Sequence, residues 1–251
     1  MSLQRCLEIF LKYLPSFLLG IRTTLVLSLA GTLIGLLLGL LVGGLKAIRI
    51  DDNASALLKY LKKLFNILAT VYIEIFRGTP MMVQAVFIYY LVYMNIFPWN
   101  KFVAALFVIS INTGAYMSEI IRSGIQAVDR GQTEAARALG FTNTQTMFDV
   151  VLPQAVKNAF PAIGNEFIVN IKDSSVLMII SITELMFQSS SIAGTTYRFT
   201  ETYFVTACVY LLLTTVTSVI LHIVENRMSH TNTSIPQSDT DPSNMKLARG
   251  K

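Results

Sequence analysis

Polar and ionisable side chains inside long apolar runs are the residues of this sequence best suited to chemistry. Glu119 lies late in one such run, and Lys172 and Asp173 lie within another. Charges at membrane depth are costly, so they normally face protein or a water-filled cavity and often mark a functional pathway. Grouped together they offer hydrogen-bond donors and acceptors to a polar solute, and the carboxylates could instead carry protons. Lys172 and Asp173 could also simply neutralise each other.

The candidates for contact with a transported solute share this setting within apolar segments. They are Glu119, Asn165, Glu166, Lys172, Asp173 and Ser174. The sequence contains no nucleophile–base pair and no metal-ligand spacing, so we expect neither a catalytic nor a metal site. An enzyme is therefore the least favoured class of protein.

A second polar group interrupts an apolar run between residues 65 and 93. Glu74 and Arg77 are three residues apart, a spacing that lets two side chains pair on one helical face. Gly78 and Pro80 follow directly and favour a bend. We expect Glu74 and Arg77 to pair beside this bend, and contact of either with solute is the alternative.

Composition indicates an all-α polytopic membrane protein. The chain has 251 residues, of which 53% are hydrophobic and 14% charged, and its mean hydropathy is +0.56. Soluble domains carry about 25% charged residues. A membrane crossing needs about 20 apolar residues. About five spanning helices are predicted, at about 17–45, 65–93, 102–121, 159–187 and 203–224. The basic residues fall between these runs and not in one patch, which argues against nucleic-acid binding.

The first predicted span carries a stripe of small residues. Gly31, Gly35, Gly39 and Gly43 recur at every fourth position. In a bilayer such a stripe allows another helix to approach closely. The stripe therefore predicts helix packing, either within this chain or against a second subunit.

Residues 129–153 form a polar, helix-prone segment between apolar runs. Asp129 is placed to cap a first short helix, and Gly140 follows it where a left-handed C-terminal cap favours glycine. Thr142 and Gln145 match a capping box that starts a second helix, which Pro153 is expected to limit. The sequence thus predicts a helix, a glycine corner and a second helix. An ordinary helical hairpin that merely fills a loop is the alternative.

The rest of the chain divides around the spanning region, 16–228. Residues 1–15 place leucines on one helical face, which fits either an amphipathic helix at the membrane surface or a packed lead-in to the first span. Residues 229–251 are polar and are expected to form a disordered tail. Basic residues are concentrated after the first span, in 129–153 and after the fifth span. The positive-inside rule therefore predicts an outside N-terminus, and a cytoplasmic location for the 129–153 loop and the tail.

The motifs resemble those of the permease subunits of bacterial ATP-binding-cassette importers for polar amino acids. The family's cytoplasmic signature matches Glu134-Ala135-Ala136, then Gly140, then Val150-Val151-Leu152-Pro153, with Val150 in place of isoleucine. Further stretches that look like this family are Phe76-Arg77-Gly78-Thr79-Pro80, Gly114 to Glu119, Gly131-Gln132, Asn165 to Ile168 and Ile171 to Ser175. The resemblance covers about residues 16–225.

The resemblance implies a type I importer permease in the bacterial inner membrane, with 129–153 as its coupling loop. The residues expected to contact the ATPase are Glu134, Ala135, Ala136, Gly140, Leu152 and Pro153. ATP and Mg²⁺ would be bound by a separate ATPase dimer, since this chain lacks a Gly-x-x-x-x-Gly-Lys-Ser/Thr phosphate loop. The other implied partners are a second permease subunit, identical or related, an extracytoplasmic binding protein, the amino acid and membrane lipid.

Two other classes of membrane protein remain open on the residues alone. An ion-coupled secondary carrier would use the intramembrane carboxylates and no ATPase. A scaffold or receptor would use the loop only for docking, although the polar density of the fourth span argues against it.

Overall fold

The computed structural model describes residues 2–48, 50 and 54–230, and all of the regular structure in them is helical. The first helices are α1 (Leu3–Lys12), α2 (Leu14–Ala47), α3 (Ala56–Gly78), α4 (Met81–Asn95) and α5 (Lys101–Gln126). They are followed by α6 (Arg130–Ala138), α7 (Asn143–Gln145), the π-helical η1 (Thr146–Val151) and α8 (Leu152–Asp173). The chain continues with the 3-10 helix η2 (Ser174–Ile180), α9 (Leu185–Thr196) and α10 (Phe199–His230). The predicted tail lies outside the described residues from 231 onward.

The packing of α2 against α5 forms the centre of the molecule. The glycine stripe makes this contact possible. A Cβ built on Gly39 would lie 2.3 Å from Cβ of Met117, and one on Gly31 would lie 2.6 Å from Cγ2 of Ile109. Gly35 meets Thr113 in the same way. The predicted close packing is therefore confirmed, and it occurs within this chain.

A buried amide connects a third helix to this pair. The Nδ2 of Asn170, on α8, donates to the hydroxyls of Thr32 on α2 (2.8 Å) and Thr113 on α5 (3.0 Å). Ser28 of α2 donates to the backbone carbonyl of Asn170 at 3.0 Å. Because these groups are 0–5% exposed, each would be costly to leave without a partner. The hydrogen bonds fix α8 at one depth against α2 and α5.

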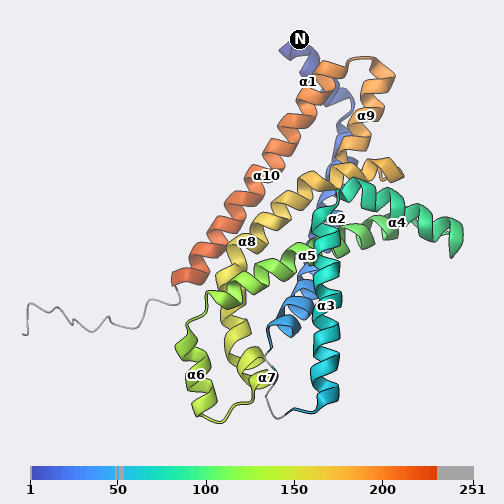
Figure 1. The fold of residues 1–251 in the computed structure, drawn as a ribbon. Helices are drawn as coiled ribbons and strands as arrows, with labels where there is room; N and C mark the ends of the chain where they lie inside the picture. The colour runs from blue at the N-terminus through green and yellow to red at the C-terminus, as the bar shows by residue number, and fades with distance from the viewer. Residues whose placement is uncertain (1, 49, 51–53, 231–251) are drawn as a thin grey trace, which may run out of the picture.

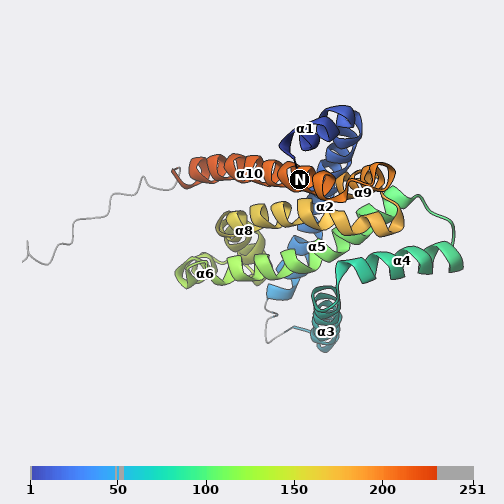
Figure 2. The same cartoon turned by 90° about the horizontal axis from the view of Figure 1, so that it is seen from above.

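The predicted second span is two helices and not one bent helix. α3 and α4 meet at 113°, so α4 leaves the bundle to one side (Figure 2). Pro80 lies at this corner, where it leaves no amide to continue the α3 ladder. Gln84 holds the corner by donating to the carbonyls of Phe76 and Thr79, and Asn112 of α5 donates to the same Phe76 carbonyl and to Gln84.

The expectation that Pro153 limits the second loop helix is wrong. The path from α7 through η1 into α8 stays helical, and Pro153 occupies the first turn of α8. Proline has no N–H for the carbonyl four residues before it, here that of Asp149. The π-helical turn accommodates this, since the amide of Leu152 donates to Met147, five residues back. Proline at this place starts a helix.

The fourth predicted span also breaks, near its C-terminal end. Ser181 adopts a left-handed backbone with φ of 64°, and α9 leaves the preceding helical path at 56°. Glu184 starts α9. Its carboxylate accepts from the amides of Met186 and Phe187 and from the hydroxyl of Tyr210 on α10. This buried carboxylate joins the start of α9 to α10.

Three described helices, α2, α5 and α10, are each long and apolar enough to cross a membrane. The number rises to five if each broken pair, α3–α4 and 143–180 with α9, crosses once. The prediction of about five spans agrees with the larger number. Exposed leucines along α2 and α10, such as Leu37 (67%) and Leu211 (67%), fit contact with lipid.

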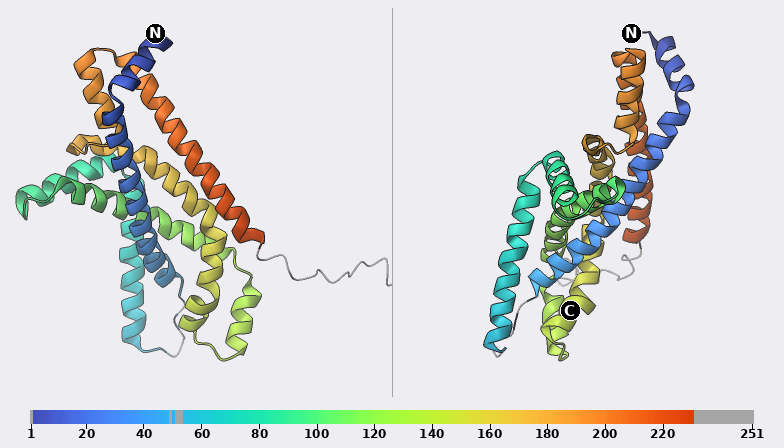
Figure 3. Two further views of the ribbon diagram at one scale, coloured as in Figure 1. Left: turned by 180° about the vertical axis from the view of Figure 1, so that it is seen from behind. Right: turned by 90° about the vertical axis from the view of Figure 1, so that its right-hand side faces the viewer.

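The first helix is buried on one side and exposed on the other. Cys6 and Ile9 are buried where α1 packs against α10, while Leu3, Leu7 and Leu11 are exposed. Arg198, at the start of α10, forms an ion pair with Glu8 at 3.6 Å. Figure 1 shows α1 and the α9–α10 turn at one end of the molecule and α6 and α7 at the other. Figure 3 shows that α2 runs most of the distance between these ends.

Candidate functional site

The 129–153 segment folds as the helix, corner and helix that the sequence predicts. The Asp129 carboxylate accepts from the Gly131 amide at 2.6 Å and caps α6. At the other end, Gly140 has φ of +88° and its amide donates to Arg137, while the Phe141 amide donates to Ala136. These two bonds make a Schellman cap, which satisfies the last carbonyls of α6. The loop is therefore a defined corner.

The two faces of α6 differ in what they leave exposed. Ala136 is only 3% exposed because α6 packs on η1 through this side. Glu134 and Ala135 are exposed on the other side. Leu139, at the corner, is 80% exposed, more than any other large apolar side chain of the loop. The sequence analysis missed Leu139; its place between a capped helix and a left-handed glycine is the signal that could have found it.

The second half of the loop, which contains the predicted contact residues Leu152 and Pro153, leads into the membrane helices. Thr142 and Gln145 form the predicted capping box. Leu152 is half-buried and packs with the cluster around Met117 and Ile121 of α5. Pro153 is exposed at the start of α8. Leu152 thus attaches the helical path from α7 through η1 into α8 to the side chains of α5.

A polar cavity of about 450 Å³ opens between α3, α5 and α8. Glu119 lies on its wall, and one carboxylate oxygen accepts from both Nε (2.9 Å) and Nη2 (2.7 Å) of Arg122. Arg77 reaches the same oxygen at 4.0 Å from the end of α3, and its guanidinium lies 5.5 Å from the centre of the Tyr116 ring. Two cations and one carboxylate thus share the wall of one cavity.

The expected pairing of Glu74 with Arg77 is wrong. Arg77 pairs with Glu119 on α5, while Glu74 is exposed and forms no ion pair with a described residue. The three-residue spacing allows contact along one helix, but α3 packs against α5, and Arg77 there reaches Glu119. Gly78 and Pro80 do lie at the bend, as predicted.

The α8 candidates occupy different surroundings. Glu166 is half-buried, and the charges of Asp173 and Arg77 both act on it. Lys172 and Asp173 are exposed, and the charge of Lys172 acts on Asp173. Asn165 is exposed as well. Ser174 is buried, and its hydroxyl donates to the Ile171 carbonyl of its own chain segment at 2.9 Å.

The structure thus brings together part of the predicted solute-contact set. Glu119 meets Arg77 of α3 and Arg122 of its own helix on the cavity wall, whereas no α8 candidate lines this cavity. The described residues hold no group of three or more His, Cys, Asp or Glu side chains that could bind a metal ion.

Comparisons with known proteins show which family this chain resembles. Residues 54–230 match the family of binding-protein-dependent transport system inner membrane components. The glutamine transport system permease protein GlnP of Escherichia coli K12 is 39% identical over 165 residues, which are 65% of this chain and 75% of that protein. A proposed glutamine transport system permease of Rickettsia prowazekii is 37% identical over 219 residues, which are 87% of this chain and 96% of the relative.

Solved structures extend the likeness to the fold. A chain from the crystal structure of an amino acid ABC transporter with histidines has a TM-score of 0.75 and 39% sequence identity, with 87% of this chain and 96% of that chain covered. An inward-facing structure of the MetNI methionine ABC transporter has a TM-score of 0.71 at 19% identity, with 86% and 98% covered, and shows a shared fold only. The match over residues 54–230, together with these relatives, shows that the chain belongs to the family of binding-protein-dependent transport system inner membrane components.

Proposed function

We propose that this chain is the permease subunit of an ATP-driven importer of an amino acid. The observation that carries the proposal is the 39% identity and TM-score of 0.75 to a chain of an amino acid ABC transporter, over 96% of that chain. The glutamine permease relatives point to the same class of solute. ATP-driven import is favoured over an ion-coupled carrier, which the intramembrane carboxylates alone had allowed.

The 129–153 corner is the proposed contact with a separate ATPase dimer. Glu134 offers a carboxylate and Ala135 a bare patch on the exposed side of α6, and Leu139 adds an apolar side chain at the corner. Gly140 holds the corner angle, and Leu152 and Pro153 pass its movement to α8. Ala136 supports α6 from inside the loop. ATP and Mg²⁺ would be bound by the partner, because the sequence lacks a phosphate loop.

The cavity between α3, α5 and α8 is the proposed solute route. Its volume of about 450 Å³ falls in the range of small-molecule sites. Arg77 and Arg122 could each face the carboxylate of an amino acid, and Glu119 its ammonium group. Glu166 does not line this cavity and is proposed as a contact further along the route. Asp173 lies about two helical turns after Glu166 on the same side of α8. It would extend the route, together with Lys172 and Asn165. Ser174 is buried at the end of α8 and does not line the cavity.

The other partners follow from the same proposal. A second permease subunit, identical or related, would complete the pathway, and an extracytoplasmic binding protein would deliver the amino acid. The chain would cross the bacterial inner membrane several times, with α1 outside and the coupling loop and C-terminus in the cytoplasm, as the distribution of basic residues predicts. In domain terms, residues 1–15 form the surface segment, 16–228 the permease and 229–251 the tail.

ATP hydrolysis in a reconstituted complex tests the proposal. The chain is co-purified with the ATPase encoded beside it, placed in liposomes, and supplied with the neighbouring binding protein and each amino acid in turn. One amino acid should raise hydrolysis severalfold. Leu139→Asp should abolish the rise by placing a charge in the ATPase contact, whereas the apolar Leu139→Met should keep it.

Two outcomes would count against the proposal. Solute uptake by liposomes that contain the chain but no ATPase would indicate a carrier. Equal ATP hydrolysis with Leu139→Asp and Leu139→Met would show that the corner does not contact the ATPase, even if the importer itself were confirmed.

A further inference from the structure

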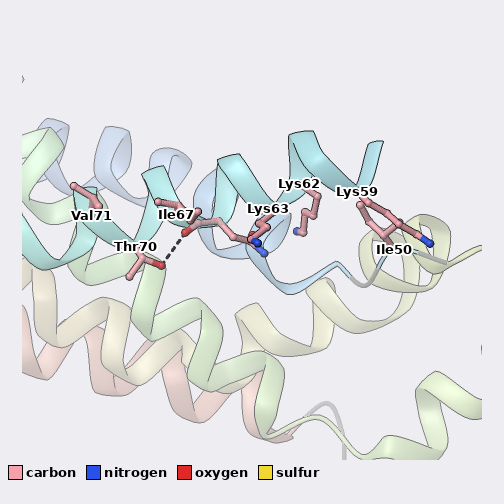
Figure 4. A pocket seen from close by; sticks show the side chains of 8 residues that line it. Ile50, Lys59, Lys62, Lys63, Ile67, Thr70 and Val71 are labelled. Carbon is pink, nitrogen blue, oxygen red and sulfur yellow. Dashed lines mark hydrogen bonds between the residues drawn. The ribbon is translucent and has the colours of Figure 1, made fainter. Parts of the chain in front are cut away.

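A groove outside the proposed solute route runs along α3. Its volume is about 520 Å³, and it lies between α3 and Ile50. Figure 4 shows the basic side chains Lys59, Lys62 and Lys63 toward one end and Ile67, Thr70 and Val71 toward the other. The groove thus changes from basic to largely apolar along a single helix.

Lys62 and Lys63 are the two ammonium groups of the basic end that matter for binding. No Asp or Glu is among the described residues that line the groove. Lys62 uses one of its three N–H donors on the carbonyl of Leu45 and lies 5.8 Å from the centre of the Phe65 ring, which fixes its position. Lys63 is exposed. The ammonium groups of the consecutive residues Lys62 and Lys63 can therefore both bind an anion.

The apolar end has the exposure of a surface that faces lipid chains. Ile67 is 52% exposed, and Val71 is 49% exposed. From Lys63 to Val71 the helix rises by about 12 Å, at about 1.5 Å per residue. That distance is enough for a headgroup phosphate at one end and the first part of an acyl chain at the other.

One polar atom between the two ends also lacks a partner. The Oδ1 of Asn66, which lines the groove, is buried without a hydrogen-bond partner among the described residues. Buried polar atoms are almost always hydrogen-bonded in proteins. A small rotation of this amide toward the groove would let it accept from a hydroxyl of a bound molecule.

We propose that this groove binds an anionic glycerophospholipid, with the headgroup phosphate at Lys62 and Lys63 and an acyl chain along Ile67 and Val71. Charge complementarity selects the anionic headgroup, since basic residues beside a spanning helix attract acidic lipids. The apolar end selects a lipid over a soluble anion, which would gain nothing from Ile67 and Val71. A headgroup that carries hydroxyls, such as that of phosphatidylglycerol, also suits Asn66.

Native mass spectrometry of the purified permease–ATPase complex tests this site. The complex is incubated with phosphatidylglycerol or with phosphatidylcholine of the same acyl chains, and the lipid-bound fractions are compared. The wild-type chain should retain phosphatidylglycerol preferentially. Lys62→Gln combined with Lys63→Gln should weaken that binding by about tenfold or more, because each lysine near an anionic headgroup contributes appreciably. Lys62→Arg combined with Lys63→Arg keeps both charges and should retain it.

A second pair of variants tests the acyl end without a change of charge. Val71→Trp fills the groove and should release the lipid. Leu68→Trp adds the same ring to the same helix at a residue that is 60% exposed and does not line the groove, so it should have no effect. Because each variant is measured in a complex that still holds the ATPase, misfolded chain is excluded from the comparison.

Several results would overturn the proposal. Equal retention of phosphatidylglycerol and phosphatidylcholine by the wild type would show that the groove does not recognise an anionic headgroup. Equal behaviour of Val71→Trp and Leu68→Trp, together with displacement of the lipid by glycerol phosphate, would indicate a soluble anion. Binding to the permease alone but not to the complex would assign the groove to a protein contact.

Discussion

Arg77 and Glu119 lie 4.0 Å apart on two different helices, although Glu74 is only three residues from Arg77 in the sequence. Glu119 is held more tightly by Arg122, whose Nη2 lies 2.7 Å from the same oxygen. Arg77 is thus the weaker of two cations on one carboxylate, and its charge also acts on Glu166 of α8. We therefore expect Arg77, rather than Arg122, to change partner when a solute enters the cavity.

Replacement of Arg77 should therefore affect transport more than stability. Arg77→Gln leaves the Arg122–Glu119 pair intact, so the free energy of unfolding should fall by no more than about 1 kcal/mol. Amino-acid uptake into liposomes with the complete complex should fall severalfold, since the cavity loses a cation. Glu74→Gln, on the same helix but without an ion pair to a described residue, is the control and should transport normally. Equal uptake by the two variants would contradict a role for Arg77 in the route.

The hydrogen bonds of Asn170 should dominate the attachment of α8. Asn170→Leu leaves the hydroxyls of Thr32 and Thr113 without their amide partner in a buried place, at a cost of about 1–3 kcal/mol. Thermal unfolding in detergent should begin at a lower temperature. Asn165→Leu changes an exposed side chain of the same helix and should leave the transition in place. If both variants unfold like the wild type, the three-helix contact does not carry this energy.

The glycine stripe should tolerate no added methyl group at its tightest contact. Gly39→Ala would place a Cβ 2.3 Å from Cβ of Met117, so α2 and α5 must move apart at a cost of about 1–3 kcal/mol. Gly78→Ala is the matched substitution, because nothing lies within 4 Å of the added atom. Unfolding measured in the same detergent should separate the two variants clearly. A larger loss with Gly78→Ala would mean that the stripe is not the main contact.

The corner of the 129–153 loop should depend on the conformation of Gly140. At φ of +88°, an alanine would pay about 1–2 kcal/mol of backbone strain. Gly140→Ala should increase amide hydrogen exchange across 129–153 and lower the ATP hydrolysis that solute stimulates. Gly140→Asn should lie between alanine and wild type, because asparagine tolerates this region better. No difference between alanine and glycine in exchange would show that the cap does not order the loop.

The sequence by itself determined the features that depend on local chemistry. Asp129, Gly140 and the Thr142–Gln145 box predicted the conformation of the 129–153 corner correctly, because caps and left-handed turns are decided within a few residues. Apolar length predicted the long helices α2, α5 and α10, and the four-residue period of the glycines predicted a close helix contact. The family motifs around Glu134 and Pro153 led to the same class of protein that the comparisons show.

Tertiary structure decided what depends on the angles between helices. The packing of α3 on α5 brings Arg77 to Glu119, which sequence spacing could not predict because the two residues lie on different helices. Pro153 was expected to end a helix, but it lies at the start of α8. A proline can end one helix or begin the next, and only the π-helical turn before Pro153 shows which occurs here. Likewise Ala136 looked like its exposed neighbour Ala135 until the packing of α6 on η1 buried it. Local hydrogen bonds are encoded by neighbours in the chain, whereas burial and charge pairing are set by residues far away in sequence.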